Sequence, residues 1–99
     1  MKVKDFLTED NWTQDYFARD KSTNNPVRVD FAIKNPDLCK FCLLGALLCC
    51  YPDGGYNDAA VRFYEIADEL NLNLSIGDFN DSPGRKFSEI KELLEKADI

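Results

Sequence analysis

Hydrophobic and polar residues alternate with a period near two in two neighbouring stretches of the N-terminal half. The first is WTQDYFAR, Trp12–Arg19, and the second is PVRVDF, residues 26–31. Such alternation is typical of half-buried strands. The turn-forming stretch DKSTNN, residues 20–25, separates them. We therefore predict a β-hairpin made of these two strands.

Longer apolar stretches follow this hairpin. We predict a central helix from about Asp37 to Cys50, because Asn35 is a good N-cap residue and Pro36 suits the first turn. Only Lys40 interrupts its apolar residues, which is typical of a buried helix. The stretch YPDGG comes next and ends this helix, because proline and glycine stop helices.

Two amphipathic helices are predicted in the C-terminal half, at about Asp58–Leu70 and Phe87–Ala97. Each spaces its apolar residues by three or four, so that one face packs on the core. These faces comprise Ala60, Phe63, Ala67 and Leu70 in the first helix, and Phe87, Ile90, Leu93, Leu94 and Ala97 in the second. The stretch Lys2–Leu7 is too short to assign to a helix or a strand.

These elements predict an α+β fold. A chain of 99 residues has the size of one domain, and its hydrophobic fraction of 44% is ample for a folded core. We expect a small single domain over residues 1–99, in which a β-hairpin packs with about three helices. The cysteine-rich helix forms the buried centre.

The net charge of −6 comes from one segment. Between Tyr51 and Asp81, seven acidic residues accompany a single base, Arg62. Such a surface repels phosphates, so direct nucleic-acid binding is not expected. The segment is interpreted as a solvated acidic face; a basic protein partner and mimicry of nucleic acid are alternatives.

No apolar run approaches the roughly 20 residues that cross a bilayer. The N-terminus MKVKDFLTED lacks the apolar stretch of a signal peptide. We therefore expect no membrane association and a cytoplasmic location, where thiols stay reduced.

All four cysteines lie in CKFCLLGALLCC, residues 39–50. On one helix Cys42 and Cys49 would stand about 10.5 Å apart along the axis, too far to share a metal ion. A redox pair would need Cys39 near a helix N-terminus, and the strand context of a thioredoxin-like motif is missing. We interpret the cysteines as core residues, and Gly45 as a place where another element packs closely. No metal or cofactor is predicted.

The stretch DFNDSPGR, residues 78–85, is predicted to be a loop dense in polar groups. It follows a calcium-loop pattern only in part, because proline replaces the required glycine. Asn80 and Asp81 favour an Asx turn, Pro83-Gly84 favours a tight turn, and Glu89 favours capping of the last helix. Arg85 is expected to pair with Asp81 or to bind an anion. The loop is thus either a ligand site or a structural turn.

Three motifs together, WTQ at 12–14, FCLLGAL at 41–47 and FNDSPGR at 79–85, resemble a family of small uncharacterised bacterial and phage proteins, a domain of unknown function. The resemblance implies roles for ten residues and a bacterial or phage origin. In this chain Phe79 stands where the family usually has Trp, and Lys86 where a capping Thr is usual. The ten residues are Trp12, Gln14, Cys42, Gly45, Ala46, Asn80, Asp81, Pro83, Gly84 and Arg85.

We predict that the protein is a non-catalytic interaction or ligand-binding protein, not an enzyme. The partner is expected to be a protein or a small ligand, bound through the acidic segment and the aromatics Tyr51, Tyr56 and Tyr64. One alternative is an enzyme with Cys42 as nucleophile beside Asn80, Asp81 and Arg85, although a chain without histidine lacks the usual activating base. A homo-oligomer is compatible with each hypothesis. The candidate binding residues are Trp12, Gln14, Cys42, Asn80, Asp81 and Arg85.

Overall fold

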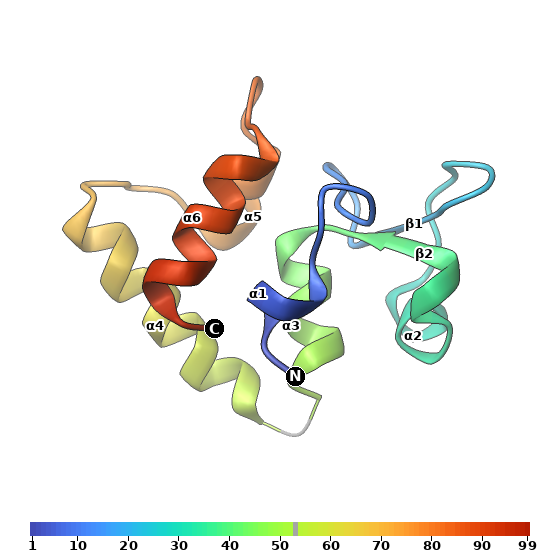
Figure 1. The fold of residues 1–99 in the computed structure, drawn as a ribbon, viewed down its shortest axis with the longest axis horizontal. Coiled ribbons are helices and arrows are strands. Elements are labelled where there is room, and N and C mark those ends of the chain that lie inside the picture. Colours follow the sequence, from blue (N-terminus) through green and yellow to red (C-terminus); the bar gives the residue numbers. More distant parts are fainter. Residues whose placement is uncertain (53) are drawn as a thin grey trace.

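A computed structural model describes residues 1–52 and 54–99 of the chain (Figure 1). Figure 1 places α3 in the middle, with α4 and α6 on one side of it and the two strands and α2 on the other. The predicted α+β class is confirmed. The elements in chain order are α1 (Val3–Phe6), β1 (Ala18–Asp20), α2 (Val29–Lys34), the 3-10 helix η1 (Pro36–Leu38), β2 (Cys39–Phe41), α3 (Leu43–Cys50), α4 (Gly55–Glu69), α5 (Ile76–Asp81) and α6 (Phe87–Ala97).

The hairpin prediction is only partly right, because one of its two strands forms, and over fewer residues than predicted. Strand β1 covers the end of Trp12–Arg19, but its antiparallel partner is β2, with Ala18 opposite Phe41. The predicted second strand is wrong, because Val29–Lys34 forms helix α2. Five alternating residues do not distinguish a strand from a single helical turn. The pairing is instead decided by burial, since both ends of β2 are buried in the core.

The predicted helix Asp37–Cys50 is also divided. Pro36 starts a short 3-10 turn, the chain then extends as β2, and α3 begins only at Leu43. The boundary lies at Cys42, whose extended backbone and side-chain sulfur cap α3. A continuous helix would lose the ladder between β1 and β2, which the tertiary structure favours. Cys39 therefore lies in a strand and not in the first turn of a helix.

The two C-terminal helices agree with their predictions. Helix α6 has the predicted bounds, and α4 begins about one turn earlier than expected. One residue of the predicted α4 face is wrong: Leu70 is 42% exposed, because the helix ends before it and Asn71 turns the chain with a φ of 57°. The predicted loop at residues 78–85 is wrong in its first half, which belongs to α5.

A backbone hydrogen bond and ion pairs hold the two ends of the described chain together. The backbone N–H of Lys4 donates to the carbonyl of Ile99 at 2.9 Å, and Asp98 pairs with Lys2 at 2.8 Å and with Lys4. Helix α1 thereby packs against both α3 and α6 (Figure 1). Within the part of the chain that the structure describes, no helix is both long and apolar enough to span a bilayer.

Candidate functional site

Asn80 of α5 is a polar side chain buried completely in the core. Its Oδ1 accepts hydrogen bonds from Trp12 Nε1 at 2.8 Å and from the backbone N of Leu43 at 2.9 Å. Its Nδ2 donates to the carbonyl of Thr13 at 3.1 Å and to Asp81 Oδ1 at 2.9 Å. An asparagine amide has two donors and an acceptor with two lone pairs, so these four contacts satisfy it. We call these contacts the Asn80 network.

The Asn80 network holds one end of a loop at Gln14–Phe17, the 14–17 loop. Gln14 Nε2 donates to the carbonyls of Asn80 at 2.8 Å and Ser82 at 3.2 Å. Asp81 Oδ1 also accepts from the backbone N of Asp15 at 2.9 Å, where the chain turns with a φ of 76°. The Asx turn predicted for Asn80 and Asp81 is wrong, since both side chains bond to distant segments. Tertiary contacts here replace the local turn.

The other end of the 14–17 loop is held by the start of α3. The backbone N of Cys42 donates to the carbonyl of Phe17 at 3.1 Å. Gly45 lies beneath the same carbonyl, and a β-carbon at position 45 would overlap the Phe17 oxygen. The prediction that Gly45 allows close packing is therefore confirmed.

Arg85 braces the end of α5. Its guanidinium lies 4.0 Å from the centre of the Phe79 ring, and its Nε donates to the Phe79 carbonyl at 2.8 Å. Its Nη1 donates to Glu89 at 3.2 Å, so the predicted pairing with Asp81 is wrong. The reason is position: Asp81 faces the 14–17 loop on one side of α5 while Arg85 packs on Phe79.

Two predictions around Arg85 are confirmed: the tight turn at Pro83-Gly84 and the capping of the last helix by Glu89. Gly84 has a φ of 78°, and the backbone N of Arg85 donates to Ser82 at 3.0 Å. Glu89 Oε1 accepts from the backbone N of Lys86 at 2.8 Å and so caps α6. This hydrogen bond, together with nearby Arg85, lowers the pKa of Glu89 below its usual value.

The Cys42 thiol is buried and serves as a helix cap. Its sulfur accepts from the backbone N of Gly45 at 3.2 Å. Burial raises the pKa of the Cys42 thiol, and the Asp81 carboxylate adds to this, while the Gly45 N–H acts in the opposite direction. A thiol that resists ionisation is a poor nucleophile.

A pocket of about 130 Å³ opens beside the 14–17 loop. The residues that line it include Tyr16 and Phe17, which are 49% and 47% exposed, and the acidic residues Asp15 and Asp81. Neither carboxylate forms an ion pair with the described residues. The residues that line this pocket, here called the loop pocket, are Asp15, Tyr16, Phe17, Cys42, Leu44, Gly77 and Asp81.

Cys39 and Cys42 are buried, as the core interpretation predicts, and the other two cysteines, Cys49 and Cys50, are half-buried on α3. Burial raises the pKa of Cys50 to about 11. Within residues 1–52 and 54–99 no three His, Cys, Asp or Glu side chains cluster as metal ligands do.

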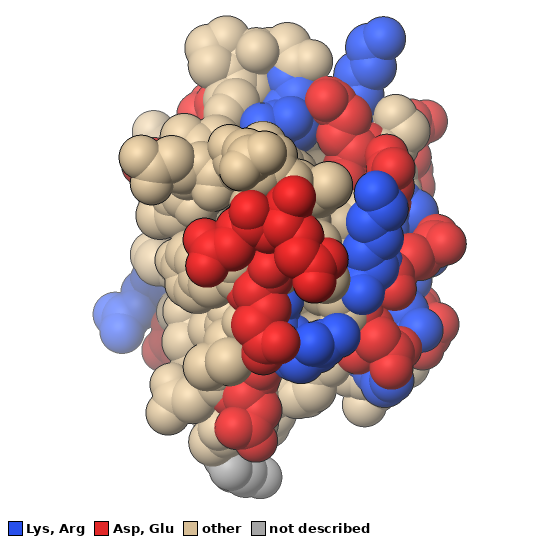
Figure 2. All heavy atoms as spheres, turned by 90° about the vertical axis from the view of Figure 1, so that its left-hand side faces the viewer, with Lys and Arg blue, Asp and Glu red and all other residues tan. Residues whose placement is uncertain are grey.

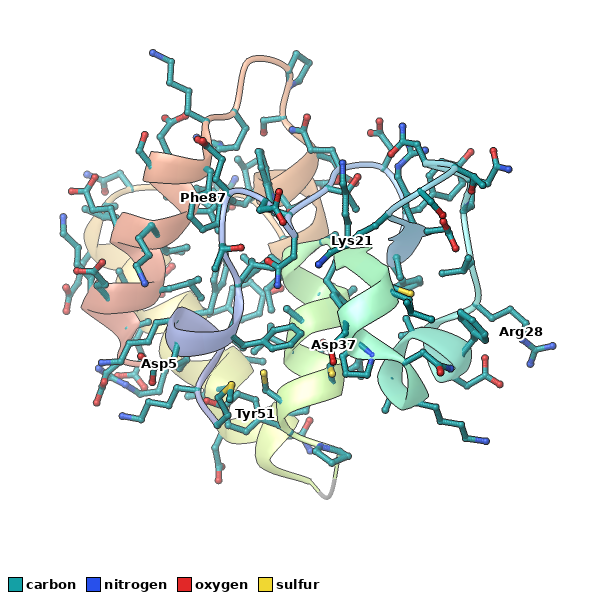
Figure 3. The ribbon with its side chains drawn as sticks, turned by 45° about the vertical axis from the view of Figure 1, so that its right-hand side comes forward. Asp5, Lys21, Arg28, Asp37, Tyr51 and Phe87 are labelled. Carbon is teal, nitrogen blue, oxygen red and sulfur yellow. The ribbon has the colours of Figure 1, made fainter. Side chains whose placement is uncertain are left out.

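Of the three tyrosines predicted to bind a partner, two pack against the core and Tyr64 is 43% exposed. Tyr51 and Tyr56 pack against the core, and Figure 3 shows Tyr51 near the end of α3. The Tyr64 hydroxyl accepts from the backbone N of Ile76 at 3.3 Å. The acidic segment, apart from Asp53, which lies outside the described residues, supplies exposed carboxylates on α4. Figure 2 shows a band of acidic side chains on this face with Lys and Arg beside it.

The structure brings five of the six candidate residues, all but Arg85, to one place. Trp12, Gln14, Asn80 and Asp81 are joined by hydrogen bonds, and Cys42 adjoins them through Leu43 and the loop pocket. Trp12 also packs on Phe87 at the start of α6, with 5.9 Å between the ring centres.

Sequence reasoning missed the residues that line the loop pocket next to these. The sequence pattern predicts a strand that includes Tyr16 and Phe17, and in a half-buried strand one of two adjacent side chains is buried. The signal that could have separated them is the aromatic pair itself, since two adjacent side chains on a strand face opposite sides.

Comparison with known proteins gives a family for the chain. The model of a family of unknown function, DUF6197, matches residues 1–98. No curated protein and no solved structure matches the chain. The match spans nearly all of the chain and confirms the resemblance to a domain of unknown function. The chain therefore belongs to the DUF6197 family.

Proposed function

We propose that this protein is a non-catalytic binding protein whose partner is another protein, and that the 14–17 loop is its docking surface. The observation that carries this proposal is the exposure of two aromatic side chains in an anchored loop. Tyr16 and Phe17 remain about half exposed although both ends of their loop are held by hydrogen bonds. Aromatic residues on a rigid, pre-organised segment are characteristic of binding surfaces.

The polar residues support binding by position rather than chemistry. The Asn80 side chain forms its hydrogen bonds with other groups of the protein, and Gln14 and Asp81 hold the 14–17 loop. Cys42 caps a helix and resists ionisation. Such groups shape a surface and leave no activated nucleophile among the described residues. We further propose a bacterial or phage protein of the cytoplasm, without cofactor and without direct nucleic-acid contact.

Site-specific photocrosslinking in the native host tests this proposal. A photoreactive phenylalanine analogue at position 17 is expected to capture one protein, and the same probe at Val61, exposed on α4, is expected to miss it. With the captured partner purified, Phe17→Ala should weaken binding about tenfold or more. Phe31→Ala is the matched control, because Phe31 is 45% exposed and does not line the loop pocket.

The alternative with Cys42 as nucleophile is separated by Cys42→Ser, which keeps a capping oxygen in place of the sulfur. Full binding of the captured partner by Cys42→Ser supports the binding function, as does an unchanged growth phenotype when this variant replaces the protein in its host. A Cys42→Ser variant that keeps full binding but shows the growth phenotype of a deletion strain would contradict the binding function and favour an enzyme. Capture at position 61 and not at 17 would move the docking surface to the acidic helix.

A further inference from the structure

The loop pocket has the chemistry of a site for a cationic side chain. Two aromatic residues, Tyr16 and Phe17, and two acidic residues, Asp15 and Asp81, help to line a space of about 130 Å³. The dimensions suit one side chain rather than a whole ligand. Resting on the proposed function, we infer that the protein partner inserts an arginine side chain into this pocket.

The carboxylates are available for a partner's charge. Asp81 Oδ1 accepts two hydrogen bonds, from Asn80 and the backbone of Asp15, while its Oδ2 meets no donor among the described residues. The carboxylate of Asp15 is exposed and likewise meets no side-chain donor in the described chain. Elsewhere Asp20, Glu89 and Asp98 engage donors within the protein. The pocket thus gathers two acceptors that lack an internal cation.

The aromatic walls favour a guanidinium over an ammonium group. A planar guanidinium stacks on aromatic faces and pairs with carboxylates through two parallel hydrogen bonds. The protein already makes such a contact: the Arg19 guanidinium lies 4.6 Å from the centre of the Tyr16 ring. Arg19 is not among the residues that line the loop pocket, and it donates to Asn24 at 2.9 Å. The residues that line the loop pocket therefore include no lysine or arginine of the protein itself.

The pocket is also pre-formed. Asp81 sits on α5 next to Asn80, whose network fixes that helix end, and Asp15 is held directly by Asp81. Cys42 and Leu44, at the start of α3, also line the pocket. An entering side chain consequently meets carboxylates whose backbone is already ordered, which lowers the entropic cost of binding. The net charge of −6 adds long-range attraction for a basic partner.

The test uses two peptides: acetyl-Gly-Gly-Arg-Gly-Gly-amide and the same peptide with citrulline, which has nearly the shape of arginine but carries a neutral urea group in place of the guanidinium. Each is titrated into the ¹⁵N-labelled full chain, and amide chemical shifts are followed at low salt. We expect saturable shifts at Tyr16, Leu44 and Gly77 with the arginine peptide and much smaller ones with the citrulline peptide. Added salt should weaken the binding.

Asp15→Asn keeps the shape of the side chain and the left-handed backbone that asparagine tolerates well. It should weaken binding of the arginine peptide about threefold to fivefold, as expected for one partly exposed ion pair. Asp68→Asn, which removes the same charge from exposed α4, should leave the affinity unchanged.

Equal binding of both peptides would overturn the arginine site while leaving the protein-binding function in place. Shifts confined to α4 would show attraction to the acidic face and would also overturn it. Equal affinity of Asp15→Asn and the unchanged protein would do the same. Absence of any shift at Tyr16, Leu44 and Gly77 overturns the site, and crosslinking at position 17 then decides whether the proposed function survives.

Discussion

At the scale of single residues, buried polar atoms are paired. Every described buried side-chain nitrogen and oxygen has a hydrogen-bond partner. Asn80 is the clearest case, because it satisfies the Trp12 indole, the first N–H of α3 and the carbonyl of Thr13. Removing a partner from such a group costs more than the net gain of one hydrogen bond, because the remaining group stays buried without water.

Asn80→Ala is expected to destabilise the protein by about 3 kcal/mol, since it leaves the Trp12 and Leu43 N–H groups without their acceptor. For a domain of this size the melting temperature should fall by about 12 °C or more. Urea unfolding measures the loss, and the fluorescence of Trp12, the only tryptophan, reports the local change. Asn73→Ala, at an exposed position, serves as control and should stay within about 0.5 kcal/mol. A loss below about 1 kcal/mol for Asn80→Ala would contradict the network's structural role.

At the scale of elements, short segments are specified by their neighbours. Helix α3 contacts α1, α2, α4 and α5, and its first turn receives the 14–17 loop. The glycine at position 45 makes this approach feasible, because any side chain there would meet the Phe17 carbonyl. Helix propensity alone would favour alanine at this position.

Gly45→Ala is therefore expected to destabilise the protein by about 1–3 kcal/mol through overpacking, despite the higher helix propensity of alanine. The matched control is Gly77→Ala in α5, where a β-carbon would enter open space. This second change should be neutral or stabilise by up to about 1 kcal/mol. Urea unfolding of both variants makes the comparison, and equal effects of the two would refute the close packing at Gly45.

At the scale of the whole molecule, the first and last residues of the described chain contact each other. Asp98 pairs with Lys2 and Lys4, and the two lysines lower the pKa of Asp98 to about 2. A carboxylate whose pKa is lowered on folding contributes stability above its unfolded value of 3.8 and loses it as the pH falls toward 2.

Asp98→Asn should consequently destabilise the protein at pH 5, and the difference from the unchanged protein should shrink as the pH falls to 2. Asparagine keeps the left-handed backbone found at this position, where φ is 56°. Urea unfolding at both pH values measures the effect, and an NMR titration of the carboxyl groups checks the pKa directly. A difference that does not depend on pH would mean that the ion pairs contribute nothing to folding.

Predictability from sequence followed the length and periodicity of each element. Helix α6 has its predicted bounds, because eleven residues repeat one apolar spacing and Glu89 caps the start. The predicted second strand failed because its residues carry only a short alternation. The site was predicted in part: Asn80 and Asp81 were expected to form a local turn, Trp12 was named only through the family resemblance, and the loop pocket was missed.

By itself the sequence determined the fold class, the two long C-terminal helices, the burial of Cys39 and Cys42, and the close approach at Gly45. These depend on periodicity, side-chain size and polarity, which are local properties of the chain. The tertiary structure alone decided that β1 pairs with β2 and that Asn80 bonds to Trp12, 68 residues away. It also decided that the 14–17 loop exposes Tyr16 and Phe17 beside two carboxylates. Such contacts arise where distant segments compete for one buried partner, and no local pattern encodes which of them wins.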